Sequence, residues 1–176
     1  MSYKTKLGAA LLATMLAAPA LAADKMNDLE IAHTAYTAGG LDIRYAHLAL
    51  GISENPEVRE FATLMIRDHT AVNEQAVALI TKLNVTPQDN SLSQALVEGA
   101  AQKRAELAGL NGKAFDCAYA KNELGYHQVV NKTIDESFIP NVTVPELKKL
   151  LSGALATFRV HQGHAQHMVK ALNCGS

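Results

Sequence analysis

The sequence predicts an all-α fold, with four long helices in a bundle and a shorter helix in the crossover between the second and third. Three observations lead to this prediction. Apolar residues recur at helical spacing in nearly every segment after Asn27. No stretch shows a sustained alternation of β-branched or aromatic residues. The chain is 48% hydrophobic but only 5% aromatic and has no Trp, an inventory that suits closely packed helices.

The charge and the composition exclude several classes of protein. Sixteen Lys and Arg stand against 17 Asp and Glu, which leaves a net charge of −1 and no basic field for a nucleic-acid backbone. The hydrophobic content is too high for a disordered chain, and two cysteines are too few for a disulfide-dense scaffold. We therefore expect no nucleic-acid partner.

Residues 1–22 are predicted to be a signal peptide. Lys4 and Lys6 form a short basic region, residues 7–18 are apolar, and residues 19–22 end in a small-x-small cleavage site. An uncleaved membrane anchor is the alternative, but the apolar run is shorter than the roughly 20 residues that span a bilayer. We expect export to the periplasm, one domain over residues 23–176, and no transmembrane segment after cleavage.

The first two long helices have clear boundaries. The first is expected over residues 27–52, and Gly39-Gly40 in its middle favours either a kink or a close helix approach. The second begins with Asn55 as the N-cap and Pro56 at the first helical position, and it continues to about residue 83.

The shorter helix and the third long helix follow a break at Pro87. The shorter helix is expected over residues 91–110, with Asn111-Gly112 as its end. The third long helix then runs over residues 113–138, and Pro140 is expected to stop it.

The last helix completes the bundle. Thr143 and Glu146 have the spacing of a capping box, with Pro145 between them, and the helix continues to about residue 172. Four long helices with one short helix in the middle connection correspond to the ferritin-like arrangement.

Several histidine and acidic residues lie in the middle of the predicted helices, on or beside their apolar stripes. Glu123 and His127 are four residues apart and therefore share one face of a helix. His167 points away from its stripe and is expected in solvent. The candidate metal ligands are His69, His127, His161, Asp42, Asp68, Asp116, Glu123 and His164.

The two cysteines bear on whether these residues can meet. In an oxidising compartment Cys117 and Cys174 are expected to form a disulfide, although a buried thiol and a frayed terminal thiol are the alternative. A tight turn between the last two helices would leave His127 beside Leu155, about 9 Å from the level of His161. The disulfide would instead set His127 within one turn of His161, so the disulfide and the histidine cluster support each other.

Two interpretations of these residues stay open. Rigid helices that carry imidazoles and carboxylates toward a common core offer ligands for Fe, Zn or Cu. Alternatively, the histidines are structural, with their ring N–H groups bound to nearby acids. A di-iron enzyme needs Glu-x-x-His on two helices, and the chain has one, from Glu30 to His33. Neither a Ser-His-acid arrangement nor a glycine-rich phosphate loop stands out, so no catalytic residue is predicted.

Several motifs occur in a fixed order along the chain, namely Asp68-His69-Thr70 and Phe115-Asp116-x-x-Tyr119, and the recurring polar residues are Asp42, Asp68, His69, Asp116, Tyr119, His127 and His161. With Gly39-Gly40 before Asp42, this pattern resembles the ferritin-like family of exported bacterial proteins known as domain of unknown function 4142. The resemblance covers most of residues 26–172. Asp42 stands where the family usually has Glu, and Glu123 where Gln is common.

The resemblance implies a periplasmic or envelope-associated helical bundle, in some members described as an outer-membrane protein. Together with the candidate metal ligands, the resemblance predicts a protein that binds a transition metal in the bundle core and acts in metal handling or envelope stress. One alternative is a non-catalytic envelope protein whose partner is another envelope protein or a second copy of the chain. The other is a ferritin-type redox enzyme.

Overall fold

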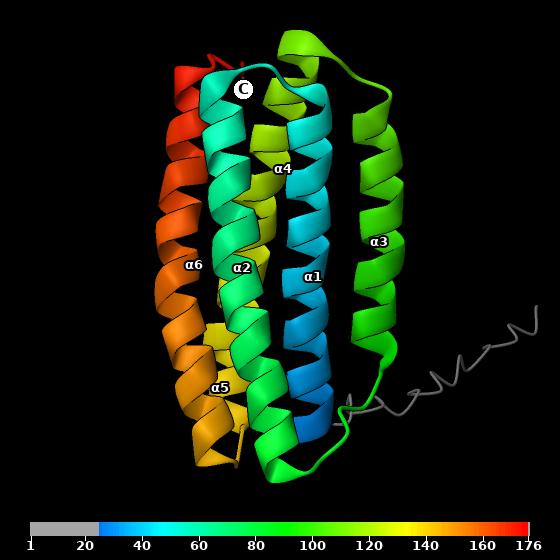
Figure 1. Cartoon of the computed structure of the whole chain (residues 1–176), viewed down its shortest axis with the longest axis vertical. Helices are drawn as coiled ribbons and strands as arrows, with labels where there is room; N and C mark the ends of the chain where they lie inside the picture. Colours follow the sequence, from blue (N-terminus) through cyan, green and yellow to red (C-terminus); the bar gives the residue numbers. More distant parts are fainter. Residues whose placement is uncertain (1–24, 176) are drawn as a thin grey trace, which may run out of the picture.

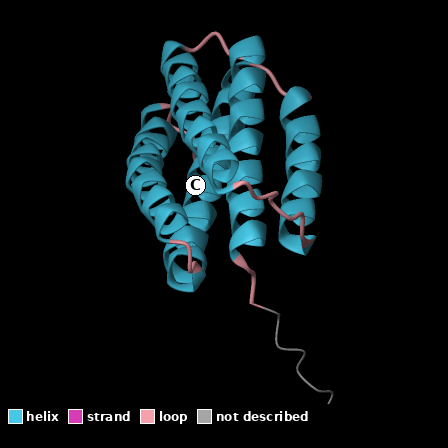
Figure 2. Ribbon diagram, turned by 60° about the horizontal axis from the view of Figure 1, so that its bottom comes forward, coloured by secondary structure: helices cyan, strands magenta, loops and turns pink. Residues whose placement is uncertain are grey.

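The computed structural model describes residues 25–175, and every regular element in that range is helical (Figures 1 and 2). The prediction of an all-α fold is therefore confirmed, while the predicted signal peptide lies outside the described residues. None of the described helices combines the length and the hydropathy that crossing a bilayer requires. The elements are α1 (Asp28–Ile52), α2 (Pro56–Leu83), α3 (Ser91–Ala108), α4 (Gly112–Thr133), a π-helical segment η1 (Ile134–Phe138), α5 (Ile139–Asn141) and α6 (Pro145–Ala171).

Asparagine side chains cap the starts of α1 and α2, close to the positions that the sequence predicts. The Asn27 side chain accepts hydrogen bonds from the N–H groups of Leu29 and Glu30, and the Glu30 carboxylate accepts from the N–H of Asn27. At the start of α2 the Asn55 side chain accepts a hydrogen bond from the N–H of Glu57, with Pro56 as the first helical residue. These caps satisfy backbone donors that would otherwise lack a partner at each helix start.

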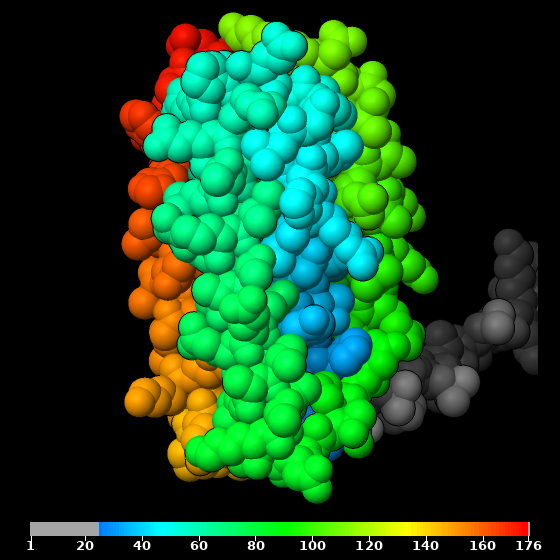
Figure 3. Space-filling model, viewed as in Figure 1, coloured from blue at the N-terminus to red at the C-terminus, as the bar shows by residue number. Residues whose placement is uncertain are grey.

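The long helices lie side by side and share one interior. α1 packs against α2 and α4, and α6 packs against the same two helices. α3 lies on the outside, against α1 and α4, and carries the chain from the end of α2 back to the start of α4 (Figure 1). In the space-filling view of Figure 3, α1 and α2 lie side by side along the length of the face shown.

Gly39-Gly40 does not interrupt α1, which is helical through both residues. The pair instead allows a close approach between helices. A Cβ atom at Gly39 would lie 2.6 Å from Oδ1 of Asn73 on α2, whereas a Cβ atom at Gly40 would meet no atom within 4 Å. Of the two expected outcomes, the close approach is therefore the one observed, and only Gly39 makes it.

This difference predicts unequal effects of two neighbouring substitutions. Gly40→Ala is expected to raise the free energy of unfolding by up to about 1 kcal/mol, because alanine has the higher helix propensity. Gly39→Ala should raise the free energy of unfolding clearly less, because the Asn73 side chain must move away from the new Cβ atom. Urea denaturation of both variants measures the difference. Equal gains would contradict the close approach.

The third long helix continues further than the sequence predicts. Instead of ending near Phe138, the chain widens into η1, where the N–H of Ile139 bonds the carbonyl of Ile134, and then forms α5 through Pro140. Pro140 lies in the first turn of α5, a position at which proline is common. Proline therefore does not stop the helix at this point.

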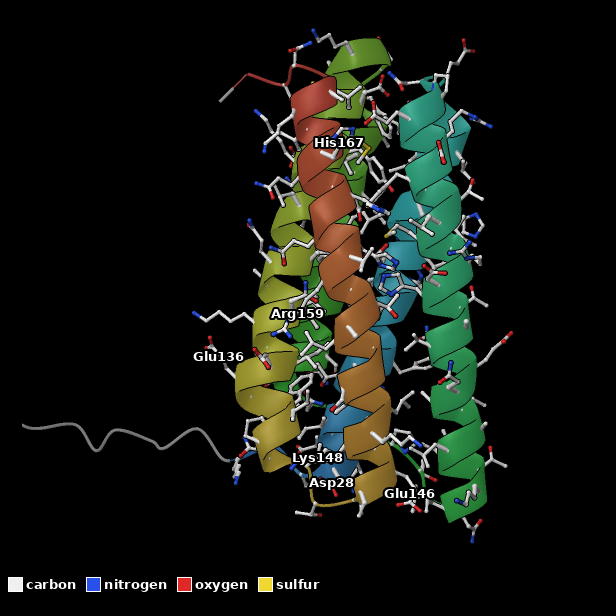
Figure 4. The ribbon with its side chains drawn as sticks, turned by 90° about the vertical axis from the view of Figure 1, so that its left-hand side faces the viewer. Asp28, Glu136, Glu146, Lys148, Arg159 and His167 are labelled. Atoms are coloured by element: carbon white, nitrogen blue, oxygen red, sulfur yellow. A yellow bond between two sulfur atoms is a disulfide. The ribbon has the colours of Figure 1, made fainter. Side chains whose placement is uncertain are left out.

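The predicted capping box at the start of α6 is wrong. Val144 is the N-cap, and no side chain of this segment caps the helix. The cap comes from α1, because the Asp28 carboxylate accepts hydrogen bonds of 2.6 to 3.2 Å from the hydroxyl and N–H of Thr143 and from the N–H of Val144. Figure 4 labels Asp28 at the same end of the molecule as Glu146 and Lys148 in the first turn of α6.

Two apolar clusters make up the core, one toward each end of the helices. One cluster includes Phe61, Phe115 and Met168, and the other includes Ile134 and Leu151. Along α2, α4 and α6, the buried histidines lie between the residues of these two clusters. The core therefore has a polar layer between two apolar layers.

Candidate metal centre

Three histidines from three different helices meet in this polar layer. His69 is on α2, His127 on α4 and His161 on α6, and all three are buried. Their ring centroids are 5.4 to 5.7 Å apart in each pair. One ring nitrogen of each lies within 4.8 Å of those of the other two. We call these three residues the histidine cluster.

Hydrogen bonding fixes which nitrogen of His127 is free. Its Nδ1 lies 2.9 Å from the backbone carbonyl oxygen of Glu123. A carbonyl oxygen can only accept, so Nδ1 carries the proton and donates it. In the neutral ring Nε2 then has a free lone pair, and it is buried with no hydrogen-bond partner. This is the protonation pattern of a histidine that binds a metal through Nε2.

A carboxylate fixes His161 in the opposite way. Nε2 of His161 donates to Oδ2 of Asp68 at 2.9 Å, while the Arg67 guanidinium donates to Oδ1 at 2.6 Å. Arg67 is the main cause that keeps the pKa of Asp68 below its usual value, so this carboxyl is an ionised acceptor. Nδ1 of His161 is left deprotonated, buried and without a partner. A carboxylate that orients a histidine in this way is common behind metal ligands.

His69 and Asp42 complete the centre. The His69 ring stacks on Phe158, with ring centroids 4.4 Å apart, and neither of its nitrogens has a partner. Asp42 of α1 is 0% exposed, and its Oδ2 lies 3.5 Å from Nε2 of His69 and 3.6 Å from Nε2 of His127. The free nitrogens of two histidines thus face one carboxylate oxygen.

Burial controls the charges in this layer. Loss of water on burial raises the pKa of Asp42 to about 8 and also raises the pKa of Glu123. The negative charge of Asp42 raises the pKa of Glu123 as well. Burial likewise lowers the pKa of His127 to about 4 and keeps the pKa values of His69 and His161 below 6.5. The three imidazoles are therefore neutral at pH 7, the state in which they bind metals.

A family model matches residues 13–168 of the chain, which include every residue of the centre. The model is that of the domain of unknown function (DUF4142). The chain belongs to this family. The membership of this family that the Asp-His-Thr and Phe-Asp-x-x-Tyr motifs predicted is therefore confirmed. No curated protein and no solved structure matches this DUF4142 chain.

The structure of this DUF4142 chain separates the predicted ligands into those that meet and those that do not. Asp42, Glu123 and His127 form a second group that could hold an ion, and it shares His127 with the histidine cluster. Asp68 contacts the centre only through His161. Asp116 is hydrogen-bonded to the Ser53 hydroxyl at 2.5 Å and belongs to neither group.

The remaining histidines of the last helix lie outside the centre. His164 is exposed, and the side chain of His167 is 79% exposed, as its position predicts (Figure 4). Two residues of the centre were not singled out from the sequence for the roles they have here. Arg67 directly precedes Asp68, and Phe158 lies one helical turn before His161, so both could have been found as neighbours of candidate ligands.

The raised pKa of Asp42 predicts how the stability of the metal-free protein depends on pH. Because the pKa of this carboxyl is higher in the folded than in the unfolded protein, its protonation stabilises the fold. This stabilisation is complete below pH 3.8, the usual pKa of the group, and is lost as the pH rises toward the folded-state value of about 8. From about pH 5 to about pH 8, the free energy of unfolding of the wild type should therefore fall as the pH rises, relative to that of Asp42→Asn. Urea denaturation of both proteins measures this difference. A pH-independent difference would mean that Asp42 is ionised in the fold.

Proposed function

We propose that this chain is an exported, periplasmic ferritin-like four-helix-bundle protein that binds one divalent transition metal ion in its core. The ligands are the histidine cluster and Asp42. The protein would act in metal handling or in the response to envelope stress. The same proposal includes removal of residues 1–22 as a signal peptide and a single domain over residues 23–176.

The convergence of unpartnered atoms carries the proposal. Buried polar atoms are nearly always hydrogen-bonded, and leaving one without a partner costs about 1 to 3 kcal/mol. Here Nε2 of His127, Nδ1 of His161 and both oxygens of Asp42 are buried without a partner in one small region. A cation between Oδ2 of Asp42 and Nε2 of His127, which lie 3.6 Å apart, would give both atoms a partner, and His127 already has this nitrogen free.

The ligand types favour certain metals. Three imidazoles and one carboxylate suit Zn, Fe or Cu, and the two cysteines are bonded to each other rather than available as thiolates. The side chains of Arg67 and Asp68 hold His161 from outside, and the carbonyl of Glu123 holds His127. Such support fixes ring orientation before the metal arrives, which reduces the cost of binding.

The disulfide supports the proposed location. Cys117 and Cys174 are bonded, with Cα atoms 5.3 Å apart. Structural disulfides are typical of exported proteins and rare in the cytosol. The pair is therefore compatible with export, as the predicted signal peptide requires.

A structural role for the histidines is the competing interpretation. It is favoured by the hydrogen bonds of His161 with Asp68 and of His127 with the Glu123 carbonyl, which would stabilise a helical core without any metal. It leaves unexplained why both nitrogens of His69 and both oxygens of Asp42 have no partner.

X-ray absorption spectroscopy of the zinc-loaded protein tests the proposed ligand set. We expect a four-coordinate ion with imidazole nitrogens at about 2.0 to 2.1 Å and one carboxylate oxygen at about 2.0 to 2.2 Å. His164→Ala and His167→Ala should give the same spectrum, because both residues lie outside the centre. A shell of oxygens without imidazole scattering would contradict the proposal.

A further inference from the structure

A cavity of about 380 Å³ lies between the helices, with the candidate metal centre at one end. Its lining runs from Ala32 to Asp42 on α1 and from His69 to Ile80 on α2. Because a helix rises by about 1.5 Å per residue, these stretches are each about 15 Å long. Pockets of about 300 to 1,000 Å³ are the usual size of small-molecule sites. The cavity therefore has room for one elongated molecule.

Small side chains on facing helices leave this space open. Alanine or glycine lines the cavity on three helices, at Ala32, Ala35 and Gly39 of α1, Ala76 of α2 and Ala154 of α6. Larger apolar side chains at these positions would fill the interior and gain dispersion contacts. Three helices thus leave the same part of the interior unfilled.

The wall of the cavity is mainly apolar along its whole length. Outside the metal centre, and apart from two tyrosines, its polar residues are spread over three helices, at His33, Thr34, Asn73 and Thr133. The Thr34 hydroxyl already donates to the carbonyl of Glu30. Cavities with apolar walls stay free of water and bind apolar molecules, even at less than half this volume. The wall therefore favours an apolar occupant.

The wall also selects against charged groups. No lysine or arginine is among the described residues that line the cavity, and Asp42 supplies its only carboxylate. A buried charge is costly unless it is paired. An anion would find no cationic partner and would meet Asp42, which groups with the buried Glu123. A cation would find Asp42 alone, and a buried ion pair gains little over an apolar contact.

Apolar side chains continue from this cavity to the surface of the protein. Seven large hydrophobic side chains are exposed in the part of the chain that the structure describes, and four of them line the cavity, namely Tyr36, Val77, Leu92 and Val129. Exposed apolar side chains that gather at one place, rather than singly, are typical of binding sites. An apolar molecule would therefore contact apolar side chains from the surface inward.

We propose that the cavity binds one elongated, uncharged apolar molecule, of the class of a medium-chain alcohol or hydrocarbon. Its chain lies along α1 and α2 between Ala35 and Ala76, and one end reaches the metal centre. The helices themselves form the wall that contacts the chain. Binding therefore does not depend on the metal ion, and the proposal goes beyond the metal site described above.

The test uses 1-octanol as the probe and a matched pair of substitutions on α2. Ala76 lines the cavity, whereas Ala78 is exposed and is not part of the lining. Ala76→Phe is expected to fill the cavity and Ala78→Phe to leave it open. Octanoate and octylammonium have the same chain with a negative or a positive charge. Binding to the purified full chain is measured by calorimetry at pH 7, and zinc uptake is measured separately for each protein.

We expect wild type and Ala78→Phe to bind one 1-octanol per chain, and Ala76→Phe to bind it at least about tenfold more weakly because the new ring occupies the site. Ethanol, which has a much shorter chain, should bind wild type at least about 100-fold more weakly. Octanoate and octylammonium should each bind at least about tenfold more weakly than 1-octanol. If Ala76→Phe does not fold, Ala35→Phe on the facing helix replaces it, with the same expected loss.

The outcomes separate this proposal from the metal site. Wild type that does not bind 1-octanol would overturn the cavity proposal, whatever its zinc content. Equal binding of 1-octanol by Ala76→Phe and Ala78→Phe, or binding of either charged analogue as tight as that of 1-octanol, would overturn it as well. Wild type that binds 1-octanol but takes up no zinc would support the cavity proposal and contradict the metal site alone.

Discussion

Replacement of His127 by alanine is expected to abolish stoichiometric metal binding. His127 belongs to both groups of residues that could hold an ion, and its Nε2 faces Oδ2 of Asp42 at 3.6 Å. Removal of the ring takes away a ligand that both groups need. We expect the affinity for zinc to fall at least about 100-fold, which is about 2.7 kcal/mol, in a calorimetric titration with a competing chelator.

Two exposed histidines provide the control for this experiment. His164→Ala and His167→Ala also remove an imidazole, but both side chains are exposed and lie outside the centre. They should bind zinc like the wild type. If the histidines were only structural, His127→Ala would instead lower the stability by a few kcal/mol and leave zinc binding as weak as in wild type.

Replacement of both cysteines by serine is expected to give the largest loss of stability. The disulfide links Cys117 near the start of α4 to Cys174 beyond the end of α6, at a sequence separation of 57 residues. A cross-link that closes a loop of this length restricts the unfolded chain by about 4 kcal/mol in the chain-entropy model. Urea denaturation of the double variant should show a loss of about 2 to 5 kcal/mol.

The reduced wild-type protein is the control for the cysteine variant. Its stability should fall to that of the double variant, because the same cross-link is removed without any substitution. The loss should also weaken zinc binding, since α4 and α6 carry His127 and His161. Equal stability of the oxidised and reduced wild-type proteins would contradict this account.

The helix boundaries set by local signals could be predicted from the sequence. Asn55 and Pro56 define the start of α2 because the cap and the fixed proline φ angle act within one turn. The start of α6 could not be predicted in this way. Its cap is the Asp28 carboxylate, from a residue more than 100 positions earlier, and such a contact depends on tertiary packing.

The meeting of His127 with His161 depended on a register that the sequence left open. A tight turn after Phe138 would have separated them, and the disulfide register would have brought them together. In the structure α5 continues the chain to Asn141 before the turn, and the two rings lie 5.5 Å apart. The π-helical segment that precedes α5 has no clear signal in the sequence.

The partners of the acidic residues could not be predicted from the sequence either. Helical periodicity placed Asp42, Asp68 and Asp116 near apolar stripes, but it could not tell which of them face one another. The structure buries Asp42 among the histidines, directs Asp68 to Arg67 and His161, and pairs Asp116 with a serine. Side-chain direction and helix register decide these contacts, and both are properties of the packed helices.

The metal content of the exported protein tests the central claim most directly. Residues 23–176 are exported into a periplasm, purified without chelator or a histidine tag, and analysed for metal per chain by mass spectrometry. We expect close to one transition-metal ion per chain in wild type and in His167→Ala, and none in His69→Ala or His127→Ala. Metal-free wild type that also takes up no Zn, Fe or Cu on titration would contradict it.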